Sequence, residues 1–337
     1  MKRIVLHIGY GKTGTTAIQG SLAANRELLA TEGILYPEWR DFVERDNHNG
    51  IAKCLTYRQH EAFLPAFFKG LHNCTADTLV ISGETLAIYP ERGLLARPQR
   101  GSIDGSLFQK NYRADPDWKH KKRDLIGELK SKLPDSEEVR VVVFLRRQDL
   151  WIESIYNEDV KGGYTAADFH AFGEYYKNSL HFDQQLELWA DAFGPENVAV
   201  RVYEREQLQG GVVRQFFEAG KICGPDGDVN QLVARLAHPQ NTTPNPRLSA
   251  EALASRRKTN ARMVWMPEAL WRRANSWARG RADALSQKAG KGELFARQEL
   301  LSRVERVAFL AQFKSGNEAV ARKYLGREDG QLFRDPL

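Results

Sequence analysis

The sequence predicts an α/β fold: a three-layer sandwich with a central parallel sheet, a P-loop-like phosphate site and a helical C-terminal part. Three observations lead to this prediction. Short runs rich in β-branched residues alternate with helical patterns, a glycine-rich turn follows the first run, and only helical patterns follow Pro246. Apolar runs of this kind are typical of strands buried on both faces. The expected strands are Arg3–Ile8, Ile34–Tyr36, Thr78–Ser82, Arg140–Leu145 and Val198–Tyr203.

Helical spacing of apolar residues predicts a helix from Thr15 to about Thr31, which Gly33 would end. A second helix, from Leu150 to Val160, should end at the glycine pair Gly162-Gly163. Residues 90–120 combine Gly, Pro and Arg without periodicity, so we interpret them as a long loop.

The 337 residues suffice for one large domain or two ordinary ones, and 42% of them are hydrophobic, which excludes a disordered chain. The change of pattern after residue 246 predicts an α/β core over 1–246. A helical region over 247–337 should pack on that core, in one continuous domain.

The net charge of +6 is concentrated in one segment. Residues 251–303 hold 12 Lys and Arg against 5 Asp and Glu, so the rest of the chain is close to neutral. This distribution argues against coating of a nucleic-acid backbone and favours a local anionic ligand. For most of the segment we expect amphipathic helices that bury their Trp residues and leave their Arg residues in water.

The cysteines Cys54, Cys74 and Cys223 are odd in number and widely spaced, so they predict neither disulfides nor a zinc site. The first apolar run meets a glycine loop instead of a cleavage site, and no run is long enough to cross a membrane. We therefore expect a cytoplasmic protein without an integral membrane segment. The sequence does not determine the oligomeric state.

A glycine-rich turn lies between the first expected strand and the first expected helix. At a helix N-terminus such a turn offers free backbone N–H groups and the positive end of the helix dipole. A lysine adds positive charge there and three threonines add hydroxyl donors, which together predict a phosphate-binding loop. The candidate ligands are Gly11, Lys12, Thr13, Gly14, Thr15 and Thr16.

The loop does not match the nucleotide-triphosphatase pattern GxxxxGK[ST]. Gly11-Lys12-Thr13 supplies its end, but the first glycine would fall at Leu6. A Walker B strand ending in Asp is also missing, since Thr78–Ser82 runs into Gly83-Glu84.

The loop instead resembles the 5′-phosphosulfate loop of sulfotransferases that use 3′-phosphoadenosine-5′-phosphosulfate (PAPS). The matching residues are Lys12-Thr13-Gly14-Thr15-Thr16. In that family an Arg at the end of a later strand and a Ser eight residues on hold the 3′-phosphate. Here Arg146 and Ser154 have this spacing, and Arg147 is an alternative one residue on. The tail ARKYLGREDGQLF is similar to that of bacterial members.

The resemblance implies a nucleotide-binding transferase that moves the sulfuryl group of PAPS to an acceptor hydroxyl or amine by in-line displacement. Such a protein must neutralise charge on the leaving oxygen and remove a proton from the acceptor. Lys12 is the candidate for the first task, and the positive loop would make a metal unnecessary. The acceptor would be a carbohydrate, a glycolipid or a small metabolite, and the basic helices slightly favour a carbohydrate.

Three residues are candidates for the catalytic base. Glu84 follows the third expected strand and should therefore lie at the carboxyl edge of the sheet, beside the loop. His48, in a polar stretch, has a side chain whose ordinary pKa suits proton transfer. Glu38, after the second expected strand, is a more distant third.

Two other classes of function stay open at this point. One is a P-loop kinase or other nucleotide phosphotransferase, which would need magnesium and a Walker B Asp. The other is a non-enzymatic module that binds anions or nucleic acid through residues 251–303, although we expect no nucleic-acid partner.

Overall fold

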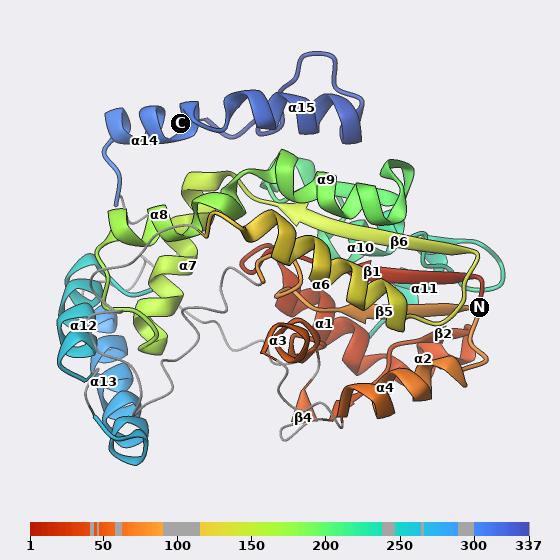
Figure 1. Ribbon diagram of the computed structural model, residues 1–337, viewed down its shortest axis with the longest axis horizontal. Coiled ribbons are helices and arrows are strands. Elements are labelled where there is room, and N and C mark those ends of the chain that lie inside the picture. The colour runs from red at the N-terminus through yellow and green to blue at the C-terminus, as the bar shows by residue number, and fades with distance from the viewer. Residues whose placement is uncertain are drawn as a thin grey trace.

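A five-stranded parallel sheet forms the centre of the computed structural model (Figure 1). The structure describes residues 1–40, 44–45, 47–57, 63–89, 115–237, 247–263, 266–288 and 300–336. The strands lie in the order β2-β5-β1-β6-β7, and each neighbouring pair is parallel. Their bounds are β1 Arg3–His7, β2 Ile34–Leu35, β5 Thr78–Ser82, β6 Glu138–Leu145 and β7 Val198–Val202. The predicted α/β class and its central parallel sheet are confirmed.

Successive side chains along each strand point to opposite faces of the sheet, so each face has its own hydrophobic core. Val5 and Val142 point to one face, whereas Leu6 and Val141 point to the other, and all four are fully buried. Because both faces are covered, the strands can be apolar throughout, which is why they were recognisable in the sequence.

Helices cover both faces and make the outer layers of the sandwich. Against the Val5 face pack α1 Thr15–Ala24, α2 Arg26–Thr31, α10 Gly211–Gly220 and α11 Val229–Arg235. Against the Leu6 face pack α3 Gly50–Tyr57, α4 Phe63–His72, α6 Trp118–Lys132, α7 Gln148–Gly162, α8 Phe169–Leu180 and α9 Phe182–Phe193. Smaller elements are β3 Trp39–Arg40, β4 Glu44–Arg45 and the 3-10 turns η2 Pro195–Asn197 and η3 Arg205–Gln207.

The first helix is shorter than the sequence predicted, because it breaks at Asn25. This residue has φ −115° and ψ 19°, outside the helical range, and separates α1 from α2. Its side chain donates to the carbonyl of Ser21 at 2.7 Å and exchanges two hydrogen bonds with the backbone of Ala237. The contact with Ala237 fixes the break from a distant part of the chain.

The predicted long loop over 90–120 is wrong at its end, since α6 begins at Trp118. Trp118, Leu125 and Leu129 are buried in the core on the Leu6 face, which explains why this stretch is helical. The remainder of the prediction, over 90–114, lies outside the described residues.

The described part of the C-terminal region consists mainly of helices, as the predicted fold class has it, and ends in a non-helical stretch over 326–336. It comprises α12 Ala250–Met263, α13 Glu268–Lys288, α14 Arg303–Ala311 and α15 Lys314–Leu325. The α12–α13 hairpin packs on α7, where Asn260 donates to the carbonyls of Val160 and Thr165, and α15 lies over α9 (Figure 1). Residue 246 is outside the described residues, so the boundary there stays a prediction. Among the described helices none is long and apolar enough to cross a membrane.

Candidate active site

The glycine-rich loop, Glu84 and Arg146 lie at the carboxyl edge of the sheet. The glycine-rich loop continues from the central strand β1, Glu84 follows β5 on one side, and Arg146 follows β6 on the other. Tyr203 follows β7 one strand further on. In parallel α/β sheets this edge is the usual place for a ligand, because loops and helix N-termini meet there.

The loop has an unusual backbone conformation. Lys12 has φ 66° and Gly14 has φ 82°, both in the left-handed region. A Cβ at Gly14 would lie only 2.8 Å from Val212 and 3.0 Å from Tyr203, so only glycine fits there. The hydroxyl of Thr13 donates to the carbonyl of Tyr10 and so holds the turn together from inside.

The backbone N–H groups from Lys12 to Thr16 donate to no acceptor among the described residues. They lie at the N-terminus of α1, where the first donating N–H groups are those of Ala17 and Ile18, both to the carbonyl of Gly14. Five consecutive free donors at a helix N-terminus form a cradle for an anion. Thr16 adds an exposed side chain, whereas Thr15 is buried.

Gly11 anchors the loop to α7. Its carbonyl accepts a hydrogen bond from the Trp151 ring nitrogen at 2.9 Å. A Cβ at Gly11 would lie 3.5 Å from both Glu84 Oε2 and Ile155. The loop therefore passes closely between the candidate base and α7.

Lys12 has a partner that the sequence did not suggest. Its Nζ lies 2.8 Å from Glu158 Oε2, and both side chains are partly exposed. Glu158 follows Ser154 by one helical turn, so the two lie on the same face of α7. That spacing was visible in the sequence, but only the structure shows that this face meets the loop.

Arg146 also faces the loop. Its Nη1 donates to the carbonyl of Lys12 at 3.2 Å, and its guanidinium lies over the Tyr203 ring at 5.9 Å. Burial and, to a smaller extent, the positive charge of Arg247 lower its pKa to about 10. A desolvated cation beside a second cation is stabilised by a bound anion. Arg247 is a site residue that the sequence analysis missed, since no motif surrounds it.

Arg147, the alternative to Arg146, has a structural role. It is buried and makes a two-pronged ion pair with Asp149, at 2.8 and 3.0 Å. Its remaining donor reaches the carbonyls of Asp335 and Pro336 near the C-terminus. These bonds use four of the five guanidinium N–H groups, so Arg146 is the arginine of the pair that is directed toward the loop.

Ser154 lies on the side of α7 that faces the loop. Trp151, Ile155 and Glu158 approach Gly11 or Lys12, and Ser154 lies one helical turn before Glu158, at the edge of this face. It is 7% exposed. The role expected for its hydroxyl stays a prediction.

Glu84 is held by two hydrogen bonds from different elements. Its Oε2 accepts from the Thr15 hydroxyl at 2.6 Å, and its Oε1 accepts from Asn49 Nδ2 at 3.1 Å. The carboxylate is thus fixed next to the first turn of α1. Asn49 is the third residue of the site that sequence reasoning missed.

His48 is fully buried and both of its ring nitrogens are used. Its Nδ1 accepts from the backbone N–H of Ser82 at 3.0 Å, and its Nε2 bonds to the carbonyl of Pro37 at 2.9 Å. Burial lowers its pKa to about 4. This geometry suits a neutral ring that supports β5 and gives no access to an acceptor. Glu38, the third candidate, is exposed after β2.

The basic segment 251–303 differs from the expected amphipathic pattern at two positions. Arg256 is buried and donates to the Asn275 side chain and to the carbonyl of Lys161. These bonds connect α12 to α13 and to α7. Trp277 is 64% exposed and lies beneath the Arg281 guanidinium at 5.5 Å. Trp265 lies outside the described residues.

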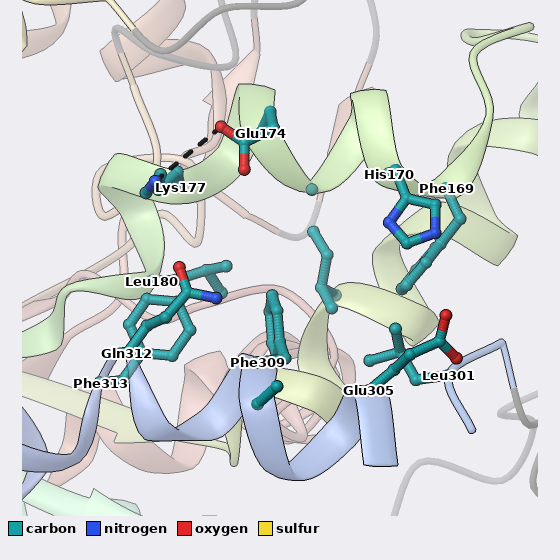
Figure 2. Close-up of a pocket in the computed structure, with 13 residues that line it drawn as sticks. Phe169, His170, Glu174, Lys177, Leu180, Leu301, Glu305, Phe309, Gln312 and Phe313 are labelled. Carbon is teal, nitrogen blue, oxygen red and sulfur yellow. Dashed lines mark ion pairs between the residues drawn. The ribbon is translucent and has the colours of Figure 1, made fainter. Parts of the chain in front are cut away.

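A cavity of about 250 Å³ lies away from the loop, between α7, α8 and α14 (Figure 2). Phe309 of α14 and Phe313, between α14 and α15, line it together with Leu180 of α8, and Glu174 and Lys177 form an ion pair at its edge. None of the predicted site residues lines this cavity. Among the described residues there is also no cluster of His, Cys, Asp and Glu side chains that could hold a metal ion.

Comparison with known proteins finds similarity to a curated protein and to a solved structure. The chain is 28% identical over 193 residues to an uncharacterized protein of Archaeoglobus fulgidus; the match covers 56% of this chain and about half, 47%, of that relative. A crystal structure of a sulfotransferase from Alicyclobacillus acidocaldarius matches with a TM-score of 0.40 and 14% identity, over 81% of this chain and 99% of the other. No family model matches the chain. Neither similar protein assigns a reaction to this chain.

Proposed function

We propose that this protein is a sulfotransferase that uses PAPS as the donor and transfers its sulfuryl group to a hydroxyl or amine of an acceptor. The observation that carries the proposal is the pairing of two anion sites at one sheet edge. The free N–H groups of Lys12–Thr16 form one, and Arg146 beside Lys12 forms the other. A donor with phosphate groups at both ends of its ribose would use both sites.

The residues present fit such a donor. The loop N–H groups and Lys12 would hold its 5′-phosphosulfate, and Arg146, Ser154 and Arg247 would hold its 3′-phosphate. When bound, PAPS would supply a sulfuryl group whose departure leaves negative charge on a phosphate oxygen. Lys12 would neutralise that charge with its ammonium group, helped by the helix dipole of α1.

Glu84 is the proposed base. It lies beside the loop, is held by Thr15 and Asn49, and keeps lone pairs free to accept the proton of an acceptor. His48 would support it indirectly, through the backbone of Ser82. The geometry therefore favours the carboxylate over the imidazole for proton removal.

A thermal-shift titration tests the donor class. Adenosine 3′,5′-bisphosphate should raise the melting temperature by several degrees, whereas ATP with magnesium and an oligonucleotide should not. No shift with the bisphosphate would overturn the proposal. A shift with ATP alone would indicate a phosphotransferase, and salt-sensitive oligonucleotide binding that survives Lys12→Ala would indicate a nucleic-acid module.

Turnover tests the two catalytic roles separately. Lys12→Ala should abolish transfer, because the leaving oxygen loses its cation. Glu84→Gln should lose at least 100-fold in rate while still binding the bisphosphate, an effect on the order of that of a general base. A normal rate in Glu84→Gln would exclude this carboxylate as the base.

A further inference from the structure

Asn49 holds the candidate base, Glu84, in place with the NH2 group of its side-chain amide. Its Nδ2 donates to Glu84 Oε1 at 3.1 Å, and because a carboxylate oxygen can only accept, the orientation of the amide is fixed. The amide oxygen therefore does not bond to Glu84. That oxygen, Asn49 Oδ1, is buried and has no hydrogen-bond partner among the residues that the structure describes.

A buried hydrogen-bond acceptor without a donor is rare, because it costs folding free energy, so it needs an explanation. Loose packing does not supply one here, because the backbone of Asn49 is well held. Its N–H donates to Asn47 Oδ1 at 3.1 Å, and its carbonyl accepts from the Thr85 hydroxyl at 2.8 Å. Thr85 directly follows Glu84, so Asn49 is held beside Glu84 by two bonds, one from its side chain and one to its backbone carbonyl.

A ligand with two neighbouring hydrogen-bond donors satisfies Glu84 and Asn49 Oδ1 at once. The amide nitrogen and oxygen share one carbon, so a donor that reaches Oδ1 must lie next to a donor that reaches the Glu84 carboxylate. Two hydroxyls on neighbouring carbon atoms have this arrangement. A single hydroxyl would satisfy Glu84 and leave Asn49 Oδ1 unpaired, which disfavours its binding.

We propose that Asn49 and Glu84 together form the acceptor site, and that the acceptor is a vicinal diol of the kind found on sugar rings. This inference rests on the proposed sulfotransferase function. One hydroxyl loses its proton to Glu84 while its oxygen forms the bond to sulfur. The bond from sulfur to the phosphate oxygen breaks, and its electron pair stays on that oxygen, beside Lys12. The neighbouring hydroxyl donates to Asn49 Oδ1 and does not react.

Equilibrium binding tests the acceptor class without turnover. The probes are trans-1,2-cyclohexanediol and cyclohexanol, titrated by calorimetry into protein saturated with adenosine 3′,5′-bisphosphate. We expect the wild type to bind the diol at least tenfold more tightly. Asn49→Ala should reduce this ratio to about one and leave bisphosphate affinity unchanged. Asn49→Ser, a smaller change, should do the same, and Asn230→Ala, on the exposed surface of α11, is the matched control.

The outcomes separate this inference from the proposed function. Equal binding of the two alcohols to the wild type, binding of neither, or a diol preference that persists in both Asn49 variants would overturn the diol site. The last result would mean that a water molecule satisfies Asn49 Oδ1. Failure of the bisphosphate to bind the wild type would instead overturn the sulfotransferase proposal. Rates with PAPS and both alcohols then give a second readout, in which the Asn49 variants should reduce the ratio of kcat/KM for the diol to that for cyclohexanol to about one.

Discussion

The Lys12 ammonium lies 2.8 Å from the Glu158 carboxylate, so the cation of the loop is already paired. The free N–H groups beside it and the guanidinium of Arg146 make the surroundings of this pair positive. An anion that enters the loop must compete with Glu158 for the ammonium group. The pair thus lowers the net affinity of the loop while it keeps the lysine at the correct place.

Replacing Glu158 should therefore strengthen anion binding. We expect Glu158→Gln to bind adenosine 3′,5′-bisphosphate about two- to fivefold more tightly, since a partly exposed ion pair contributes about 0.2–1 kcal/mol. Calorimetric titration at low salt measures the change. Glu318→Gln, which removes a carboxylate paired with Arg322 on α15, is the control and should bind as the wild type does. Weaker binding in Glu158→Gln would mean that the carboxylate positions Lys12 for the ligand.

The adjacent arginines should give opposite phenotypes. Arg146→Lys should weaken bisphosphate binding about 10- to 100-fold with little loss of stability, because a lysine cannot make a bidentate bond to phosphate. Arg147→Lys should keep the binding and lose about 2–4 kcal/mol of stability, since it disrupts a buried pair with Asp149. Urea unfolding and calorimetric titration of both variants measure the two effects. If Arg147→Lys lost binding and Arg146→Lys did not, the 3′-phosphate would be assigned to the wrong arginine.

The sequence was sufficient for the sheet and the loop, because both depend on local patterns. A strand buried on both faces is a continuous apolar run, and the loop is a short motif between a strand and a helix. The contacts of the site are not local. Glu84 and Asn49 are 35 residues apart in the sequence, and Lys12 and Glu158 are 146 apart. Nor does any pattern around His48 show that its ring is buried under Pro37 and Ser82.

Two buried histidines should make the fold sensitive to acid. Burial lowers the pKa of His7 to about 3 and that of His48 to about 4, and both rings contact Ser82. The unfolded chain has histidines of ordinary pKa, near 6.5, and so binds more protons than the folded chain below that pH. The stabilisation is complete above pH 6.5 and decreases as the pH falls toward 4, by about 1.4 kcal/mol per pH unit for each histidine.

Urea unfolding between pH 7.5 and 5 tests this expectation. In His48→Gln, which cannot titrate at this position, the decrease in unfolding free energy below pH 6.5 should be smaller than in the wild type, by up to about 1.4 kcal/mol per pH unit. His120→Gln is the control, because His120 is exposed on α6 and paired only with Asp124. Equal pH dependence in the wild type and in His48→Gln would show that the ring does not stay neutral in the fold.

Two glycine substitutions should change stability in opposite directions. Gly14 has φ 82° and a Cβ there would lie 2.8 Å from Val212, so Gly14→Ala should cost about 2 kcal/mol or more and weaken bisphosphate binding. Gly173 is inside α8, on the wall of the cavity in Figure 2, and a Cβ there would meet nothing within 4 Å. Gly173→Ala should therefore add about 0.5–1 kcal/mol, because alanine loses less backbone entropy on folding.

The double variant separates the two causes at Gly14. Val212→Ala removes the side chain that a new Cβ would meet but leaves the left-handed backbone unchanged. If crowding dominates, Gly14→Ala should cost less stability in the Val212→Ala background than in the wild type. If backbone strain dominates, the cost should be the same in both, at about 1–2 kcal/mol for a non-glycine residue with positive φ. A Gly14→Ala protein that is as stable as the wild type and binds the bisphosphate equally well would show that the loop has a different conformation from the one described.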